Sequence, residues 1–196
     1  KKIDLNTEEY FALAVQNHKN NNLKLAEKFY NETLKANPNH ADAQNNLGIL
    51  LNQLGQYQKA VNCYEKAIQV NPGHADAHSN LGNIFKGLGE LKKAVSCYEK
   101  AIQINPGHAN AYNNLGNTFN QLGEHQKAVS CYEKTIQINP NYADAFSNMG
   151  NALKDRGELN KAIEAYKKSI SLNPNYGDAY TNMGVAFQEQ GKYEEA

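Results

Sequence analysis

The sequence predicts an all-α fold of the α-solenoid class, in which antiparallel helix pairs stack on one another. Five prolines, two series of glycines and one series of alanines recur at an interval of 34 residues. Each interval contains two apolar stripes with helical spacing. A helix pair of this size cannot bury both stripes alone, so each pair has to pack against its neighbours. The prolines are Pro38, Pro72, Pro106, Pro140 and Pro174.

The repeat at residues 41–74 shows the expected elements in order. An apolar stripe from Ala43 to Leu54 predicts the first helix, which we call helix A. Gly55 follows at the point where a short turn needs a positive φ. A second stripe from Tyr57 to Ile68 predicts helix B. We expect helix B to end at Asn71–Pro72, because proline disfavours helical conformation in the residue before it.

The same register divides the chain into six repeats. With each proline at position 32, they span residues 7–40, 41–74, 75–108, 109–142, 143–176 and a shorter 177–196. We expect residues 1–196 to form one solenoid domain of a longer protein, since the chain starts without Met and stops inside a helical pattern. Glycine at position 8 and alanine at position 20 predict a close approach of helices A and B. Tyrosine at position 24 is expected to fill the space between repeats.

Charge and hydropathy narrow the choice of partner. The chain has 20 Lys and Arg against 20 Asp and Glu, with a pI near 7.2 and a mean hydropathy of −0.74. This balance argues against nucleic acid and anionic lipid as partners, because both depend on clustered basic residues. We find no apolar run that could span a membrane and no signal-peptide pattern. We therefore expect a cytoplasmic location and a protein or peptide partner.

The repeat resembles the tetratricopeptide repeat (TPR), whose signature reads W-x2-L-G-x2-Y, A-x3-F and P. The third repeat reads His78-x2-Leu81-Gly82-x2-Phe85, Ala94-x3-Tyr98 and Pro106. The chain has no Trp, so other residues fill the first signature position. The resemblance implies a right-handed superhelix in which helix A lines a concave groove.

Residues that often carry chemistry follow the repeat instead of forming a site. Cys63, Cys97 and Cys131 share one position of helix B, and helices about 8–10 Å apart keep such residues too distant for a disulfide. His40 and His74 hold position 34, where tyrosine substitutes in later repeats, so we predict a packing role for them. No metalloprotease, C-x-x-C, nucleophile-elbow or phosphate-loop motif occurs. We expect no catalytic residue, no metal and no cofactor.

An excess of asparagine, 29 of 196 residues, leads to the functional prediction. Positions 2, 6, 9 and 13 of helix A form one polar face. We call the asparagines at positions 6 and 9 the asparagine ladder. The predicted peptide-binding residues are Asn46, Asn80, Asn114, Asn148 and Asn182 at position 6, Asn83, Asn117 and Asn151 at position 9, and Asp42, Asp76, Asp144 and Asp178 at position 2.

A side-chain amide both donates and accepts hydrogen bonds, so the ladder suits the N–H and C=O groups of an extended peptide. With repeats about 10 Å apart and a rise of about 3.3 Å per residue, one amide would meet the peptide about every three residues. The aspartates would favour ligand side chains that donate hydrogen bonds or carry positive charge. An alternative stays open, in which the asparagines bridge adjacent repeats or bind water and hold no ligand.

The phrases N-L-G-N and A-D-A-x-x-N, as in residues 75–83, resemble the superhelical TPR arm of O-linked N-acetylglucosamine transferases and their bacterial relatives. This resemblance implies that the position-6 asparagines hold a substrate backbone and that the position-2 aspartates select side chains. It leaves open a second function, the substrate-targeting arm of a larger glycosyltransferase-type enzyme. A third possibility is a scaffold that self-associates through exposed solenoid ends.

A separate set of asparagines precedes the prolines. A short polar side chain there can satisfy backbone groups left free where helix B ends. These residues are Asn37, Asn71, Asn105, Asn139 and Asn173.

Overall fold

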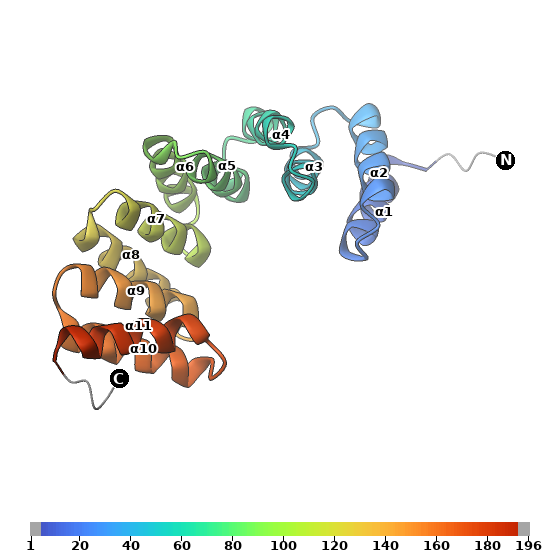
Figure 1. Ribbon diagram of the computed structural model, residues 1–196. Helices are drawn as coiled ribbons and strands as arrows, with labels where there is room; N and C mark the ends of the chain where they lie inside the picture. Colours follow the sequence, from blue (N-terminus) through green and yellow to red (C-terminus); the bar gives the residue numbers. More distant parts are fainter. Residues whose placement is uncertain (1–4, 192–196) are drawn as a thin grey trace. The chain divides into compact units, whose positions relative to one another are not determined.

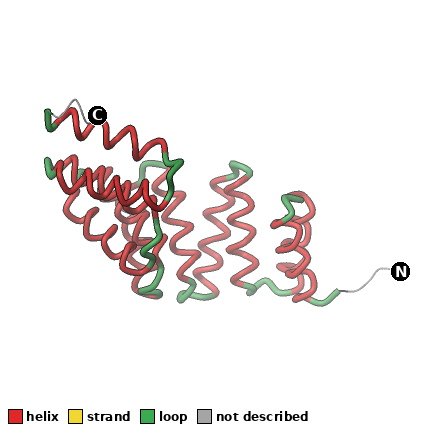
Figure 2. Tube along the Cα trace, turned by 90° about the horizontal axis from the view of Figure 1, so that it is seen from below, coloured by secondary structure: helices red, strands yellow, loops and turns green. Residues whose placement is uncertain are grey.

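The computed structural model describes residues 5–191, which contain eleven α-helices and no strand (Figures 1 and 2). The helices are α1 (Thr7–Lys19), α2 (Leu23–Ala36), α3 (Ala41–Gln53), α4 (Tyr57–Val70), α5 (Ala75–Gly87), α6 (Leu91–Ile104), α7 (Ala109–Gln121), α8 (His125–Ile138), α9 (Ala143–Asp155), α10 (Leu159–Leu172) and α11 (Gly177–Glu189). Odd-numbered helices up to α11 are the predicted helices A, and even-numbered ones are the helices B. The all-α prediction is confirmed. No helix between residues 5 and 191 combines the length and apolarity that crossing a membrane requires.

The chain divides into two compact units, Lys1–Glu90 and Leu91–Ala196. In the first unit each helix from α1 to α4 packs on the next, and α3 also contacts α1 and α5. In the second unit the same pattern runs from α6 to α11, and α9 also contacts α7 and α11 (Figure 1). Helices α1, α3, α7 and α9 therefore each pack on their own helix B and on the next helix A. One continuous domain over residues 1–196 stays a prediction.

The turns between helices A and B adopt the predicted left-handed conformation. Gly55 has φ 73°, and Asn21, which holds the same position in the first repeat, has φ 58°. A side chain with a β-carbon rarely tolerates this region, so glycine and asparagine are the residues that fit. The prediction from the glycine spacing is confirmed.

Helix B ends where the prolines predict. The residue before each proline leaves the helical region, as Asn71 does with φ −130° and ψ 91°. Its side-chain oxygen accepts a hydrogen bond from the backbone N–H of Gly73 at 3.0 Å. The four equivalent asparagines accept the same bond from the residue two positions on. These asparagines serve the helix ends, as the sequence predicts.

In three helix pairs, α3–α4, α7–α8 and α9–α10, a tyrosine ring lies on a glycine in the core. A β-carbon placed on Gly116 would come within 2.7 Å of Cε1 of Tyr132 in the same repeat, and the pairs Gly48–Tyr64 and Gly150–Tyr166 are equally close. Each ring therefore packs between helices A and B of one repeat. We expected these tyrosines to fill the space between repeats, and the structure places the three rings against the glycine of their own repeat, where the missing side chain leaves room.

We predict that Gly116→Ala destabilises the protein. The added methyl group would overlap the buried Tyr132 ring, and overpacking of this kind costs about 1–3 kcal/mol. Urea unfolding followed by circular dichroism measures the change. Gly177→Ala is the matched control, because a β-carbon there meets nothing within 4 Å. Equal stability of Gly116→Ala and wild type would contradict the packing argument.

Stability should also fall steeply above pH 10. Tyr30, Tyr64, Tyr98, Tyr132 and Tyr166 are at most 1% exposed. Burial raises the pKa of Tyr30 to about 12 and raises the pKa of the other four as well. Between the unfolded pKa near 10 and the raised folded pKa, the unfolded chain binds fewer protons than the folded one, so the free energy of unfolding decreases as pH rises.

Urea unfolding at pH 8, 10 and 11 measures this effect, with tyrosine ionisation followed by absorbance in parallel. We expect a pH dependence that corresponds to more than one proton. A free energy of unfolding that stays constant from pH 8 to 11 would show that the tyrosines are not protected as described.

Candidate functional site

The predicted site residues lie in rows on the helices A of each unit. The position-2 aspartates are exposed in the first helical turn, and the asparagines at positions 6 and 9 are half-buried. The first unit brings together Asp42, Asn46, Asp76, Asn80 and Asn83 on α3 and α5. The second unit brings together Asn114, Asn117, Asp144, Asn148, Asn151, Asp178 and Asn182 on α7, α9 and α11.

Two of the position-6 amides link adjacent repeats. The side-chain NH2 of Asn80 donates to Oδ1 of Asn45 at 3.0 Å, and that of Asn148 donates to Oδ1 of Asn113 at 3.2 Å. Both acceptors hold position 5 of the preceding repeat and are buried, with 5–6% of their surface exposed. The bridging role that the sequence left open is therefore present. Each bridge uses one amide N–H, which leaves the second N–H and the carbonyl of the position-6 residue.

The position-9 asparagines serve the buried tyrosines. The hydroxyl of Tyr132 donates to Oδ1 of Asn117 at 2.7 Å, and that of Tyr166 donates to Oδ1 of Asn151 at 2.7 Å. A buried hydroxyl without a partner is costly, so these bonds stabilise the pair. Neither NH2 group, of Asn117 or of Asn151, makes a hydrogen bond among the described residues, so both keep their donors.

The side chain at position 34 hydrogen-bonds the side chain at position 2 of the same repeat. Nδ1 of His74 accepts from the backbone N–H of Ala77 at 3.3 Å, which caps α5. Since Nδ1 accepts, the ring proton lies on Nε2, which donates to Oδ1 of Asp42 at 3.1 Å. The Asp42 side chain stays 68% exposed. The sequence predicted only a packing role for His74. It did not predict the hydrogen bond from His74, before α5, to Asp42 on α3, which we call the staple.

Tyrosine makes the equivalent staple in the second unit. The hydroxyl of Tyr142 donates to Oδ1 of Asn110 at 2.9 Å. Tyr176 hydrogen-bonds Asp144, and burial first, then the hydrogen bond and charge of Asp144, raise the pKa of Tyr176 to about 12. Histidine and tyrosine can replace each other at position 34 because each carries a donor at the far end of its ring.

The ladder of the second unit has acidic edges. Asp144 and Asp178 form one edge at position 2, and Asp155 and Glu189 form the other at position 13, all of them exposed. Asp155 lies 3.7 Å from Nζ of Lys154 and 3.9 Å from Nδ1 of His125. Positions 2, 6, 9 and 13 of α7, α9 and α11 contain no Lys or Arg. Asp155 and Glu189 were not among the predicted site residues. Their place at position 13 of the predicted polar face could have indicated them.

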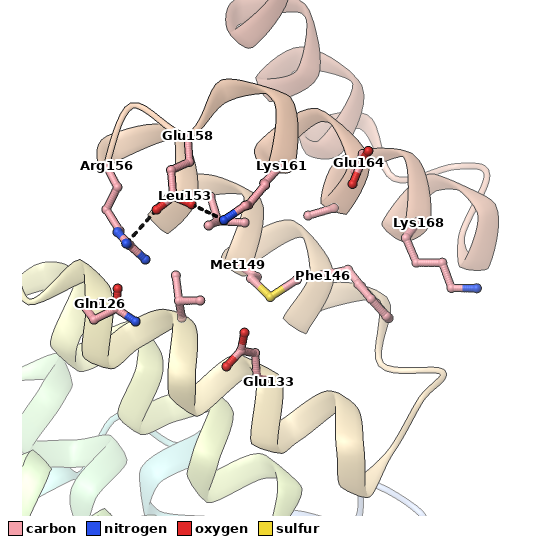
Figure 3. Close-up of a pocket in the computed structure, with 12 residues that line it drawn as sticks. Gln126, Glu133, Phe146, Met149, Leu153, Arg156, Glu158, Lys161, Glu164 and Lys168 are labelled. Carbon is pink, nitrogen blue, oxygen red and sulfur yellow. Dashed lines mark hydrogen bonds and ion pairs between the residues drawn. The ribbon is translucent and has the colours of Figure 1, made fainter.

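A second surface feature is a groove of about 480 Å³ between α8 and α10, on another face of α9 (Figure 3). Phe146, Met149 and other apolar side chains form its floor. At one end Glu158 lies 2.7 Å from both Arg156 and Lys161. The hydrogen bond from Lys161 lowers the pKa of Glu158, with the charge of Arg156 adding to the effect. Arg156, Glu158 and Lys161 pair with one another at this end, and Glu133, Glu164 and Lys168 also line the groove.

The cysteines do not form a reactive centre. Burial raises the pKa of Cys97 and Cys131 to about 11 and also raises that of Cys63. A thiol with so high a pKa is protonated at neutral pH and is a poor nucleophile. Within residues 5–191, no three His, Cys, Asp or Glu side chains converge as metal ligands.

Comparison of the sequence with family models finds the tetratricopeptide repeat along most of the chain. Models described as tetratricopeptide repeat match residues 10–72, 40–106, 73–141 and 131–164, and one described as TPR repeat matches 150–191. A comparison with curated proteins finds no match.

Solved structures of TPR proteins resemble the chain closely. The crystal structure of MamA is 28% identical, with a TM-score of 0.74 over 83% of this chain and 95% of that one. YrrB, described as a TPR protein with an unusual peptide-binding site, is 25% identical, with a TM-score of 0.72 over 88% and 89% of the two chains. PilF of Pseudomonas aeruginosa is 18% identical, with a TM-score of 0.84 over 96% and 87%, and shares the fold.

A double-mutant cycle tests the staple between His74 and Asp42. We expect His74→Ala to cost about 1 kcal/mol, because the α5 cap is lost. The coupling energy with Asp42→Ala should be about 0.5 kcal/mol, since the carboxylate is largely exposed. Urea unfolding of the wild type, both single variants and the double variant gives this energy. Strictly additive effects would mean that the two side chains do not interact in solution.

Proposed function

The chain belongs to the tetratricopeptide repeat family, and we propose that it is a non-catalytic interaction module whose helices A bind an extended polypeptide. TPR proteins generally mediate protein–protein interactions, and the similar protein YrrB is described as having a peptide-binding site. The proposal assigns the asparagine ladder to the peptide backbone and the acidic edges to the peptide side chains.

Unused hydrogen-bonding capacity on the ladder is the observation that carries the proposal. Asn148 spends one N–H on Asn113 and keeps a second N–H and its carbonyl. Asn182 makes no side-chain hydrogen bond among the described residues, although it is half-buried. Polar groups in such positions gain from a partner, and a peptide backbone offers donors and acceptors in alternation.

The order of the helices matches an extended ligand. In the second unit α7 contacts α9 and α9 contacts α11, so Asn114, Asn148 and Asn182 follow one another at roughly helix-packing distance, about 10 Å. Three residues of an extended chain cover about the same distance. In the first unit Asn46 and Asn80 make a shorter row, because Ala12 holds position 6 of α1.

The charges suggest what kind of peptide binds. Four exposed carboxylates flank the ladder of the second unit, and no basic residue shares its four positions. A peptide with Lys or Arg would meet complementary charge there, with an effect that weakens as salt screens the exposed groups. Each backbone bond contributes about 0.5–1.5 kcal/mol, and ordering the peptide opposes the sum, so we expect an affinity in about the micromolar range.

Two single substitutions separate ligand binding from bridging between repeats. Asn148→Ala removes a bridge and a ligand contact, whereas Asn182→Ala removes only a ligand contact. On an array of unrelated synthetic peptides, we expect each variant to bind about 2- to 10-fold more weakly across the sequences that the wild type binds. Only Asn148→Ala should lower the melting temperature.

Gln137→Ala is the control, because this side chain is exposed and belongs to the helix B α8, outside the predicted site. It should leave peptide binding unchanged. If Asn148→Ala lowers the melting temperature while neither ladder variant alters binding, the asparagines are bridging residues only. If the wild type binds no peptide at all, the proposed function is wrong.

A further inference from the structure

A small pocket opens beside the ladder in the first unit. It has a volume of about 200 Å³ and is lined by Asn52, Tyr57, Asn83, Ile84, Gly87 and Leu88. Leu88 is 55% exposed and Tyr57 is 52% exposed, more than the other large apolar side chains of the described residues. Apolar surface that is left open in a concave site is typical of a ligand pocket.

Gly87 is the residue that leaves room for the pocket. It holds position 13 of helix A, where the other helices carry Lys19, Gln53, Gln121, Asp155 and Glu189. A β-carbon placed on Gly87 would meet no atom within 4 Å, so close packing does not demand glycine here. Gly87 has an ordinary helical conformation as the last residue of α5, so no turn requires it either. Glycine therefore leaves open space at a position where the other helices carry longer side chains.

The chemistry of the lining points to one kind of occupant. No charged side chain lines the pocket; Ile84, Leu88 and the ring of Tyr57 form apolar walls, and the amides of Asn52 and Asn83 lie at its polar side. A cavity of about 150 Å³ with apolar walls is large enough for benzene, so about 200 Å³ suits a single branched or aromatic side chain. Lys or Arg would find no carboxylate among these residues.

The pocket is continuous with the ladder, because Asn83 belongs to both. We propose that this pocket receives one apolar side chain, such as that of Leu or Phe, from the extended polypeptide bound along the ladder of the first unit. The inference rests on the proposed function and adds a sequence preference to it. The ladder reads the backbone of the ligand, and the pocket selects one residue of it.

The pocket can be tested without a peptide by NMR titration with N-acetyl-phenylalanine amide. We expect shifts centred on the backbone amide of Gly87 and on the side-chain amides of Asn52 and Asn83. Gly87→Gln, which restores the residue of other repeats, and Tyr57→Ala, which removes one wall, should each weaken binding at least tenfold. Both sites are at the surface, and the first replaces a helical glycine with a better helix former.

N-acetyl-lysine amide is the matched probe and should produce no such shifts. Gly177→Gln is the matched variant, a glycine-to-glutamine change in another helix A where a β-carbon also meets nothing. It should bind the phenylalanine derivative as the wild type does. Equal affinity of wild type and Gly87→Gln, or shifts located elsewhere, would overturn the proposal.

A peptide array separates this inference from the proposed function. We expect peptides bound by the wild type to share an apolar residue, and this preference to disappear in Gly87→Gln. If peptides bind and lose affinity in the ladder variants, but their preferred residues are the same in Gly87→Gln, the pocket inference fails and the proposed function stands. If the phenylalanine derivative binds and no peptide does, both fail, because the pocket is then not part of a peptide site.

Discussion

The contact between a buried tyrosine and a glycine is the constraint on which the helix pairs α3–α4, α7–α8 and α9–α10 depend. Helix A can approach the Tyr132 ring only because Gly116 has no side chain. The ring is nearly inaccessible to solvent, so its hydroxyl has to find a partner inside the pair. That partner is Asn117 on helix A, one residue after the glycine. The packing of Tyr132 on Gly116 therefore fixes the position of the Asn117 amide. Its Oδ1 already accepts a hydrogen bond from the tyrosine.

The hydrogen bonds between repeats extend the same logic. Asn148 reaches back to Asn113, and Tyr142 reaches back to Asn110, so adjacent helices A are joined through both position 6 and position 2. An amide has two donors and two acceptor sites, and a carboxylate has about four. One structural bond leaves most of that capacity in place. The two roles weighed for the asparagines, bridging and binding, are compatible, because the bridge holds the side chain in a fixed orientation and reduces the entropy that a ligand has to overcome.

Most of the fold could be predicted from the sequence, because local chemistry decides it. Pro72 ends a helix and Gly55 makes a turn whatever surrounds them, and the structure confirms both. The staple of His74 on Asp42 could not be predicted, since it joins residues 32 positions apart that approach only when α5 packs on α3. Histidine and tyrosine replace each other at position 34, and this exchange indicates a shared role. The role is hydrogen bonding to position 2, because both rings carry a donor at their far end. The ligand-binding role of the ladder is still a prediction, because a periodic polar face has the same pattern with or without a ligand.

A periodic surface has a consequence for specificity. Equivalent asparagines on equivalent helices offer the same hydrogen bonds at each step, and every peptide backbone can accept them, so a regular ladder cannot distinguish one sequence from another. Discrimination requires positions where the repeats differ. Position 13 is such a position, because it changes from Gly87 in the first unit to Asp155 and Glu189 in the second. An open pocket favours an apolar side chain at one step, and a carboxylate favours a basic one at another. In the function we propose, the regular repeat supplies the affinity that all ligands share, and its departures from regularity supply the choice among them.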